Sequence, residues 1–337
     1  MNHQQKKRKE EPSARAAKNV PPLLLDGELI RERYQVDFMI GGGGFGQIFK
    51  GTDSVTGEHL AIKVEPPEKD GRRIKAEYQV LSILRGLLCN DVPDSSTSSQ
   101  AIKGKVCIIV VQSHIPKLQA SGTLRKSSFI IMTLLGLNLN DLRKKEKKQM
   151  FSKGTLYRIG KQLTMALHHV HASGFVHRDV KPSNACIGLP PKENVIFLVD
   201  FGMVRRFHDR EGNMRRAREH AGFRGTMRYA ALAVHQRKET GPTDDFLGLL
   251  YTMIELGDAS LPWSKSKNAE QVEHLKEIVP MEILCKNQPK PLTEFGEYIR
   301  SLQWDQTPDY EWIKDVFQSC AGETITDLTP FDWEGKD

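Results

Sequence analysis

The feature that most constrains the fold of this chain is the run His177-Arg178-Asp179-Val180-Lys181-Pro182-Ser183-Asn184, followed by Asp200-Phe201-Gly202 sixteen residues after Asn184. Transfer of a phosphoryl group from a metal-bound nucleotide needs positioned charges more than covalent chemistry. In such a reaction Asp179 would accept the proton of the attacking hydroxyl, and Lys181 would stabilise the transferred group. Asn184 and Asp200 carry the hard oxygen ligands that Mg²⁺ prefers. The two motifs therefore predict Mg²⁺-dependent phosphoryl transfer from ATP.

The tripeptide His-Arg-Asp alone does not establish this chemistry, because it also occurs in ordinary surface loops. The full pattern H-R-D-x-K-x-x-N with D-F-G downstream is typical of protein kinases, since several fixed positions must match at once. This interpretation requires that the nucleotide-holding half of the site lies upstream.

A glycine-rich segment lies at the required place. Tyr34–Ile40 alternates apolar and polar residues like a strand, and a run of glycines follows it. In a dinucleotide-binding fold such glycines open a helix. Here they lead instead into Gln47–Gly51, a turn, and a further strand over Leu60–Val64. The pattern therefore predicts a β-hairpin over phosphates, in which glycines permit positive φ and a close approach of the backbone.

Lys63 lies in the apolar strand that follows the hairpin. An unpaired ammonium in such a strand would be costly, so Lys63 requires a carboxylate and a phosphate as partners. We choose Glu77, on a helix that apolar spacing predicts over Arg72–Leu88. Glu65 and Glu68 are alternatives, although both lie close to the turn before that helix.

Strands are predicted again at Val106–Gln112 and Ser128–Thr133, and the second leads into Leu134-Leu135-Gly136. We interpret residues 134–136 as a hinge that binds adenine through its backbone, with Met132 guarding the deeper pocket. The complete predicted ATP-binding set is Ile40, Gly41, Gly42, Gly43, Gly44, Phe45, Gly46, Ile48, Ala61, Lys63, Met132, Thr133, Leu134 and Leu135.

Helical spacing dominates the rest of the chain. Helices are predicted at Asn138–Lys148, Thr155–Ala172, Asp245–Leu256, Glu270–Ile278, Thr293–Trp304 and Tyr310–Cys320, with a short strand over Val195–Val199. His168, His169 and His171 lie together on one helix, and we assign them a structural role rather than metal binding. The basic run at 143–148 is interpreted as a solvated face, with an anionic docking patch as the alternative.

Composition limits the classes of partner. The 49 basic and 42 acidic residues give a net charge of +7, which favours anionic partners. No zinc-finger or RNA-binding pattern is present, so nucleic acid is not expected. No apolar run approaches the ~20 residues that span a bilayer, so no membrane partner is expected either.

The five cysteines have no C-x-x-C spacing, which favours a reducing compartment. We therefore expect a cytoplasmic protein. The cluster Lys6-Lys7-Arg8-Lys9 adds the nucleus as a further location if it is an import signal rather than a solvated tail.

Arginines concentrate after Asp200. Arg pairs bidentately with phosphate and carboxylate, so this segment predicts protein substrates with Ser or Thr near acidic or phosphorylated residues. The alternative is that several of these arginines hold the shape of their own segment. The residues concerned are Arg205, Arg206, Arg210, Arg215, Arg216, Arg218, Arg224 and Arg228.

Further motifs resemble the casein kinase one superfamily. These motifs are Gly44-Phe45-Gly46, Leu134-Leu135-Gly136, Leu139-Asn140-Asp141-Leu142, Phe223-Arg224-Gly225-Thr226-Met227-Arg228-Tyr229-Ala230, Asp244-Asp245 and Leu261-Pro262-Trp263. The Phe-Arg-Gly-Thr-x-Arg-Tyr-Ala motif is most similar to that of the tau-tubulin kinase branch. The resemblance covers roughly residues 34–322.

The resemblance implies an α+β, bilobal Ser/Thr protein kinase, and we expect the protein to be a monomer. A kinase domain over 29–325 would contain a β-rich N-lobe over about 34–133 and a helical C-lobe over 137–325. A disordered basic tail over 1–28 and a C-terminal tail over 326–337 would flank it.

The resemblance also implies roles for particular residues. Lys181 points to Ser/Thr rather than Tyr specificity, and Asp245 would tie the backbone of the catalytic loop. Arg228, with Arg224 and Thr226, would contact the substrate or its anionic groups. No Ala-Pro-Glu follows this segment; Ala231, Ala233 and Gly248 stand where relatives often have Ser, Asn and Ser. These departures leave the anchoring of the segment open.

Two other classes of function remain open. One is a pseudokinase scaffold that binds ATP and partners without turnover, although Lys63, Asp179, Asn184 and Asp200 are all intact. The other is a small-molecule phosphotransferase of the same fold, but such enzymes usually lack the Arg-Asp-x-Lys order.

Overall fold

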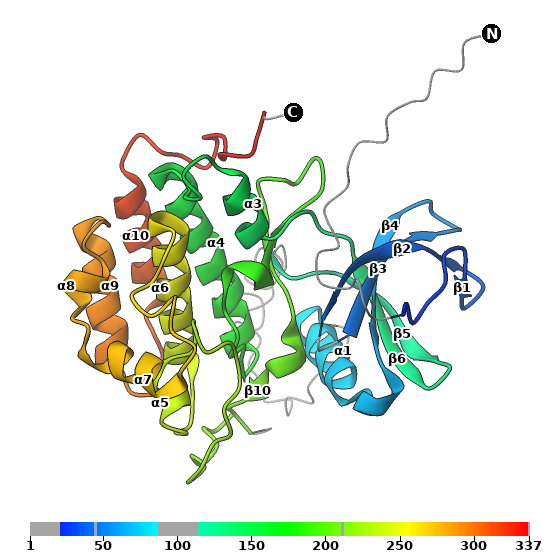
Figure 1. Ribbon diagram of the computed structural model, residues 1–337, viewed down its shortest axis with the longest axis horizontal. Coiled ribbons are helices and arrows are strands. Elements are labelled where there is room, and N and C mark those ends of the chain that lie inside the picture. Colours follow the sequence, from blue (N-terminus) through cyan, green and yellow to red (C-terminus); the bar gives the residue numbers. More distant parts are fainter. Residues whose placement is uncertain (1–20, 44–45, 87–113, 210–211, 336–337) are drawn as a thin grey trace, which may run out of the picture. The chain divides into compact units, whose positions relative to one another are not determined.

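The computed structural model describes residues 21–43, 46–86, 114–209 and 212–335 (Figure 1). The chain divides into two compact units, Met1–Tyr78 with Lys117–Leu134 and Gln79–Pro116 with Leu135–Asp337. The boundary between Leu134 and Leu135 falls within the segment that the sequence predicts as a hinge.

The first unit is built on an antiparallel sheet with the strand order β1-β2-β3-β4-β6-β5. Alternate side chains of β3 are buried, as expected for a strand with one face on a core. Val36, Phe49, Ile62 and Ile131 form the centre of that core and are completely buried. The strands are β1 (Leu29–Ile30), β2 (Tyr34–Gly43), β3 (Gly46–Asp53), β4 (His59–Glu65), β5 (Leu118–Leu124) and β6 (Ser127–Thr133).

Helix α1 (Arg72–Leu84) follows the short 3-10 helix η1 (Pro67–Lys69) and ends four residues earlier than predicted. The cause is Gly86, which has a left-handed φ of 67 and whose N–H bonds to the carbonyl of Ile83. Strand β5 was not predicted, because its Ala, Ser, Gly and Thr residues lack an apolar alternation. The predicted strand Val106–Gln112 lies outside the described residues.

The second unit is mainly helical. Its described helices are α3 (Leu139–Lys145), α4 (Lys153–Ala172), α5 (Leu232–His235), α6 (Pro242–Asp258), α7 (Ala269–Ile278), α8 (Met281–Leu284), α9 (Lys290–Ser301) and α10 (Tyr310–Ala321). Side-chain caps start four of them, since Asn138, Ser152, Asn268 and Asp309 accept hydrogen bonds from the first turns of α3, α4, α7 and α10. Phe246, Phe295 and Phe317 are fully buried between α6, α9 and α10.

Two small antiparallel ladders lie beside these helices. β7 (Phe175–Val176) pairs with β10 (Arg205–Arg206), and β8 (Ala185–Ile187) pairs with β9 (Ile196–Leu198). The 3-10 helix η3 (Pro182–Asn184) directly precedes β8, and the 3-10 helix η4 (Phe201–Met203) lies between β9 and β10 in the chain. No helix in the described ranges combines the length and the apolar composition needed to cross a membrane.

Both segments that the sequence assigns to tails contribute to the units where they are described. Near the N-terminus, Leu24 is buried, and the side-chain amide of Gln47 bonds to Pro21 and Leu23. Near the C-terminus, Phe331 is buried beneath the guanidinium of Arg158. The reason is apolar content: each segment carries large side chains that bury surface against its own unit. Residues 1–20 lie outside the described ranges.

Candidate active site

The predicted pair of Lys63 and Glu77 is present in the first unit. Lys63 lies on β4, and its Nζ is 2.7 Å from Oε2 of Glu77 on α1. Glu77 is 2% exposed, so its charge requires the ammonium. The alternatives are placed differently: the Glu65 carboxylate accepts the N–H of Ile74 in the first turn of α1, and Glu68 is exposed on η1.

The glycine-rich segment forms the predicted hairpin. β2 and β3 pair as far as Gly43 and Gly46, while Gly44 and Phe45 lie outside the described residues. Gly46 has φ +142, and a Cβ there would lie 2.3 Å from the carbonyl oxygen of Val64. Only glycine therefore fits where the hairpin passes β4.

The sheet register brings most other predicted ATP-binding residues together. Ile48 on β3 lies opposite both Gly41 on β2 and Lys63 on β4, and Ala61 lies opposite Met132 on β6. Ile40, Gly42 and Gly43 continue β2, and Thr133 ends β6. Leu134 and Leu135 follow on either side of the boundary between the units.

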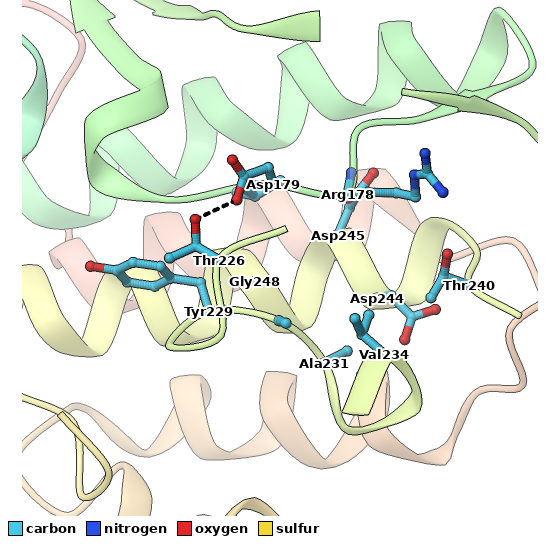
Figure 2. Close-up of a pocket in the computed structure, with 12 residues that line it drawn as sticks. Arg178, Asp179, Thr226, Tyr229, Ala231, Val234, Thr240, Asp244, Asp245 and Gly248 are labelled. Carbon is cyan, nitrogen blue, oxygen red and sulfur yellow. Dashed lines mark hydrogen bonds between the residues drawn. The ribbon is translucent and has the colours of Figure 1, made fainter. Parts of the chain in front are cut away.

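In the second unit, Asp179 lies at the centre of a closed set of hydrogen bonds. Lys181 Nζ donates to Asp179 Oδ2 at 2.7 Å. The Thr226 hydroxyl donates to Asp179 Oδ1 at 2.8 Å (Figure 2). Lys181 Nζ also donates to Thr226 Oγ1 at 2.7 Å. Asn184 Nδ2 donates to the Asp179 carbonyl oxygen and to Oδ2. Asp179 and Asn184 are buried, so these contacts fix the direction of the carboxylate.

Two backbone features place the predicted metal ligands next to each other in the fold. β8 begins directly after Asn184, and its ladder with β9 continues through the hydrogen bond from Val199 N to Asn184 O at 2.9 Å. Asp200 follows Val199 and turns the chain with a left-handed φ of 66. Because Asp179 accepts the amide hydrogens of Asn184, Oδ1 is the amide atom that can bind a cation. An amide oxygen and a carboxylate fit Mg²⁺.

Asp245 on α6 binds the backbone of the catalytic loop, residues 177–184. Its buried carboxylate accepts the backbone N–H groups of His177 at 2.6 Å and Arg178 at 2.7 Å, and His171 Nε2 at 2.9 Å. Burial opposes ionisation, but the hydrogen bond from His171 and the His177 contacts hold the pKa of Asp245 below its ordinary value. Arg178 has a left-handed φ of 69, a costly conformation for a residue with a side chain, and the carboxylate stabilises it.

The arginine-rich segment divides into internal and exposed members. Arg205 and Arg218 both bind the buried carboxylate of Glu239, at 3.0 and 2.8 Å, so they hold the shape of the segment itself. Burial opposes the charge of Glu239, yet Arg218 and Arg205 lower its pKa to about 2. Arg215, Arg216 and Arg224 are exposed, and Arg210 lies outside the described residues.

Arg228 and Thr226 have partners that the sequence did not reveal. Arg228 Nη1 is 2.9 Å from Glu255 Oε1, and Nη2 donates to the Ser264 carbonyl. Glu255 also accepts the Tyr229 hydroxyl. Thr226, predicted as a substrate contact, bonds to Asp179 and Lys181. No local pattern indicates these contacts, because they join residues more than 25 positions apart.

A small cavity of about 20 Å³, enough for one water molecule, lies between the catalytic loop, residues 226–234 and the start of α6 (Figure 2). Asp244 lines it and accepts the N–H of Gly241 at 2.8 Å. Burial raises the pKa of Asp244 to about 7, and repulsion from Asp245 and Glu239 adds to the effect. The folded protein therefore binds a proton here at pH values where the unfolded chain has lost it.

This proton predicts a pH dependence of stability. Because the folded pKa exceeds the ordinary value of 3.8, the free energy of unfolding should fall as pH rises from about 4 to about 7. Asp244→Asn keeps an acceptor for Gly241 but cannot ionise, so it should flatten this dependence and be more stable than wild type at pH 8. Thermal unfolding of both proteins between pH 4 and 8 measures this pH dependence. Asp309→Asn, at the exposed N-cap of α10, is the control and should keep the pH dependence of wild type. Parallel curves for Asp244→Asn and wild type would contradict the assignment.

The fold and these contacts define a protein kinase domain. The chain matches the family model described as protein kinase domain over residues 34–321, and it belongs to that family. Family membership implies the use of ATP and a divalent metal ion.

Curated relatives place the chain among the serine/threonine protein kinases. It is 35% identical over 310 residues to a Dictyostelium discoideum protein named as a serine/threonine-protein kinase, covering 91% of this chain and 58% of that relative. It is 33% identical over 318 residues to a Caenorhabditis elegans protein named as a casein kinase I, and 32% identical over 319 residues to another named as a serine/threonine-protein kinase. The last two matches cover 91% of this chain and 85% and 84% of the relatives.

Proposed function

We propose that this kinase transfers the γ-phosphoryl group of ATP, with Mg²⁺, to Ser or Thr hydroxyls near acidic or phosphorylated residues of proteins. This is the preference that the resemblance to the casein kinase one superfamily, and to its tau-tubulin branch, implies. The observation that supports phosphoryl transfer most directly is the closed set of contacts among Asp179, Lys181, Thr226 and Asn184.

Each contact in this set has a chemical consequence. The Asp179 carboxylate accepts the proton of the attacking hydroxyl as the new O–P bond forms and the bond from the γ-phosphorus to the β–γ bridging oxygen breaks, which releases ADP. The remaining lone pairs of the carboxylate allow this while Thr226 and Lys181 stay bound. The Lys181 ammonium lies at Asp179 Oδ2 and stabilises charge on the transferred group. Thr226 restrains both side chains, so the acceptor and the ammonium keep one geometry.

We assign nucleotide binding to residues of both units. In the first unit, Glu77 directs the Lys63 ammonium, which would bind the α- and β-phosphates. In the second unit, Asn184 and Asp200 would hold Mg²⁺, which neutralises phosphate charge when bound.

Substrate preference is assigned to the exposed arginines. Arg215, Arg216 and Arg224 are free of the carboxylate that binds Arg205 and Arg218, so they can attract a phosphate or a carboxylate of a substrate. Arg228 stays a candidate because its side chain is 41% exposed, although Glu255 offsets much of its charge.

A pair of acceptor peptides, identical except for one phosphoserine near the acceptor Ser, tests the preference. We expect kcat/KM to be higher for the phosphorylated peptide, and Arg215/Arg216/Arg224→Gln to reduce that advantage roughly tenfold, equivalent to about 1.4 kcal/mol. Lys145/Lys147/Lys148→Gln removes the same charge from exposed positions at the end of α3 and should preserve the ratio.

The possible outcomes separate the parts of the proposal. Equal kcat/KM for the two peptides would refute the preference while leaving the transfer reaction intact. A loss caused only by the lysine variant would move anion binding to the basic run at 143–148. ATP binding with no transfer to any Ser or Thr peptide would support the pseudokinase alternative.

A further inference from the structure

Helix α7 buries a lysine where its packing needs an apolar residue. Val272 and Lys276 are the residues of α7 that are buried, one turn apart, and Lys276 is 2% exposed. A buried ammonium costs free energy unless it is well compensated, and a methionine would fill a similar volume without that cost. The contacts of Lys276 should therefore show what its charge does.

Lys276 binds the end of the arginine-rich segment. Its Nζ donates to the carbonyl oxygens of Met227 at 2.8 Å and Ala230 at 2.5 Å, and lies 3.2 Å from Nε2 of His235 on α5. The ammonium also lies 5.2 Å from the ring centroids of both Tyr251 and Trp263. Carbonyl dipoles and aromatic faces thus offset part of the cost of burying the charge.

Burial lowers the pKa of both titratable side chains in this cluster. Burial, together with the nearby Lys276 charge, lowers the pKa of His235 to about 4, so His235 is neutral at physiological pH and one of its ring nitrogens is an acceptor. Burial also lowers the pKa of Lys276 to about 7. Its hydrogen-bond donors remain directed at the two carbonyls in either protonation state.

These carbonyls belong to the segment that carries Thr226. The N–H groups of Tyr229 and Ala230 bond to the carbonyl of Thr226, so residues 226–230 form one tight turn. Trp263 Nε1 donates to the Arg228 carbonyl at 2.8 Å, beside the two carbonyls bound by Lys276. The carbonyl groups of Met227, Arg228 and Ala230 are therefore bonded to side chains of the helical unit, and Lys276 binds two of them.

The same turn forms part of a pocket beside the catalytic loop. The pocket has a volume of about 410 Å³ and is lined by Lys181, Thr226, Met227, Arg228, Trp263 and Val272, among others. A shift of the turn would move the Thr226 hydroxyl from Asp179 and would reshape this pocket at once.

We propose that Lys276 is a positioning residue for phosphoryl transfer, which cross-links the Met227 and Ala230 carbonyls and so keeps Thr226 and the pocket beside the catalytic loop aligned with Asp179. The proposal rests on the proposed kinase activity. It also accounts for the anchoring of a segment that has no Ala-Pro-Glu motif, because the anchor comes from α7.

Two substitutions of Lys276 provide a graded test. Lys276→Met keeps the volume and removes every donor, whereas Lys276→Gln retains an amide donor for one carbonyl. We expect kcat/KM for the acceptor peptide to fall roughly 10–100-fold in Lys276→Met and less in Lys276→Gln, because a displaced turn misaligns the acceptor. KM for ATP should stay within about twofold, since Lys63 and Glu77 belong to the other unit.

A matched control distinguishes positioning from stability. Leu275→Ala removes a partly buried side chain from the same helix without touching these carbonyls, and should lower the melting temperature with little change in peptide kcat/KM. Hydrogen exchange of residues 226–231 should accelerate in Lys276→Met but not in Leu275→Ala.

Each result decides the proposal. Equal losses toward peptide and ATP, or losses that follow the melting temperature in all three variants, would overturn it. Failure of both Lys276 variants to fold would show that Lys276 acts on global stability, and would also overturn it. A wild-type protein that phosphorylates no peptide would refute the proposed function instead, whereas an active wild type with an equally active Lys276→Met would refute this inference alone.

Discussion

Replacing Asp179 with Asn is expected to lower kcat by about 10²–10⁴-fold, because the amide cannot accept the proton of the attacking hydroxyl. The variant also loses the ionic contact with Lys181, which donates to the carboxylate at 2.7 Å. ATP affinity should change only a few-fold, since Lys63 and Glu77 bind each other in the other unit. Phosphate transfer to a Ser peptide measures kcat, and calorimetric titration with ATP measures binding.

Asp305→Asn is a suitable control, because Asp305 is exposed and lies beyond α9. It should leave both kcat and ATP affinity unchanged. If Asp179→Asn phosphorylated the peptide as fast as wild type, Asp179 would not be the proton acceptor. If it lost ATP binding in parallel with turnover, the effect would be one of folding rather than of chemistry.

The part of the site that the sequence predicted best depends on the cost of burying charge. Lys63 sits in an apolar strand, so it had to have a carboxylate partner, and helical spacing singled out Glu77. The structure shows this contact at 2.7 Å. The motif also fixes the order of Asn184 and Asp200, and a ladder between β8 and β9 lies between them in the chain. Their role as metal ligands stays a prediction.

Contacts between distant segments could not be predicted. Thr226 lies 47 positions from Asp179, and nothing in its neighbourhood indicates a bond to a catalytic carboxylate. Lys276 follows Val272 by one helical turn, which is compatible with an ordinary solvated lysine until the tertiary structure shows its burial. Helix α6 begins three residues before its predicted start, since Pro242 fits the first turn and Gly241 precedes it.

The arginine-rich segment shows the limit of composition as evidence. The sequence left open whether these residues bind substrate or shape their own segment, and the structure shows that one answer does not serve for all. Arg205 and Arg218 share Glu239, and Arg228 binds Glu255. Charge counts cannot separate these residues from exposed Arg215, Arg216 and Arg224, because the difference lies in which carboxylates the fold brings near.

Among these variants, Asp245→Asn should lose the most stability, about 3–5 kcal/mol in the free energy of unfolding. The carboxylate of Asp245 is buried and accepts three hydrogen bonds, two of them from backbone N–H groups of the catalytic loop. An amide has one acceptor oxygen, so its NH₂ group would face the N–H of Arg178 or, in the other orientation, the donors of His177 and His171. Urea unfolding at pH 8, followed by circular dichroism, measures the change.

The adjacent residue Asp244 provides a matched control for this prediction. Asp244 and Asp245 are adjacent, but burial raises the pKa of Asp244 to about 7, whereas its hydrogen bonds lower that of Asp245 despite burial. The same substitution should therefore have opposite effects at pH 8: Asp244→Asn removes an unfavourable buried charge and stabilises, and Asp245→Asn removes a charge that three donors require and destabilises. Equal free energies of unfolding for the two variants would show that the carboxylate of Asp245 does not hold the catalytic loop.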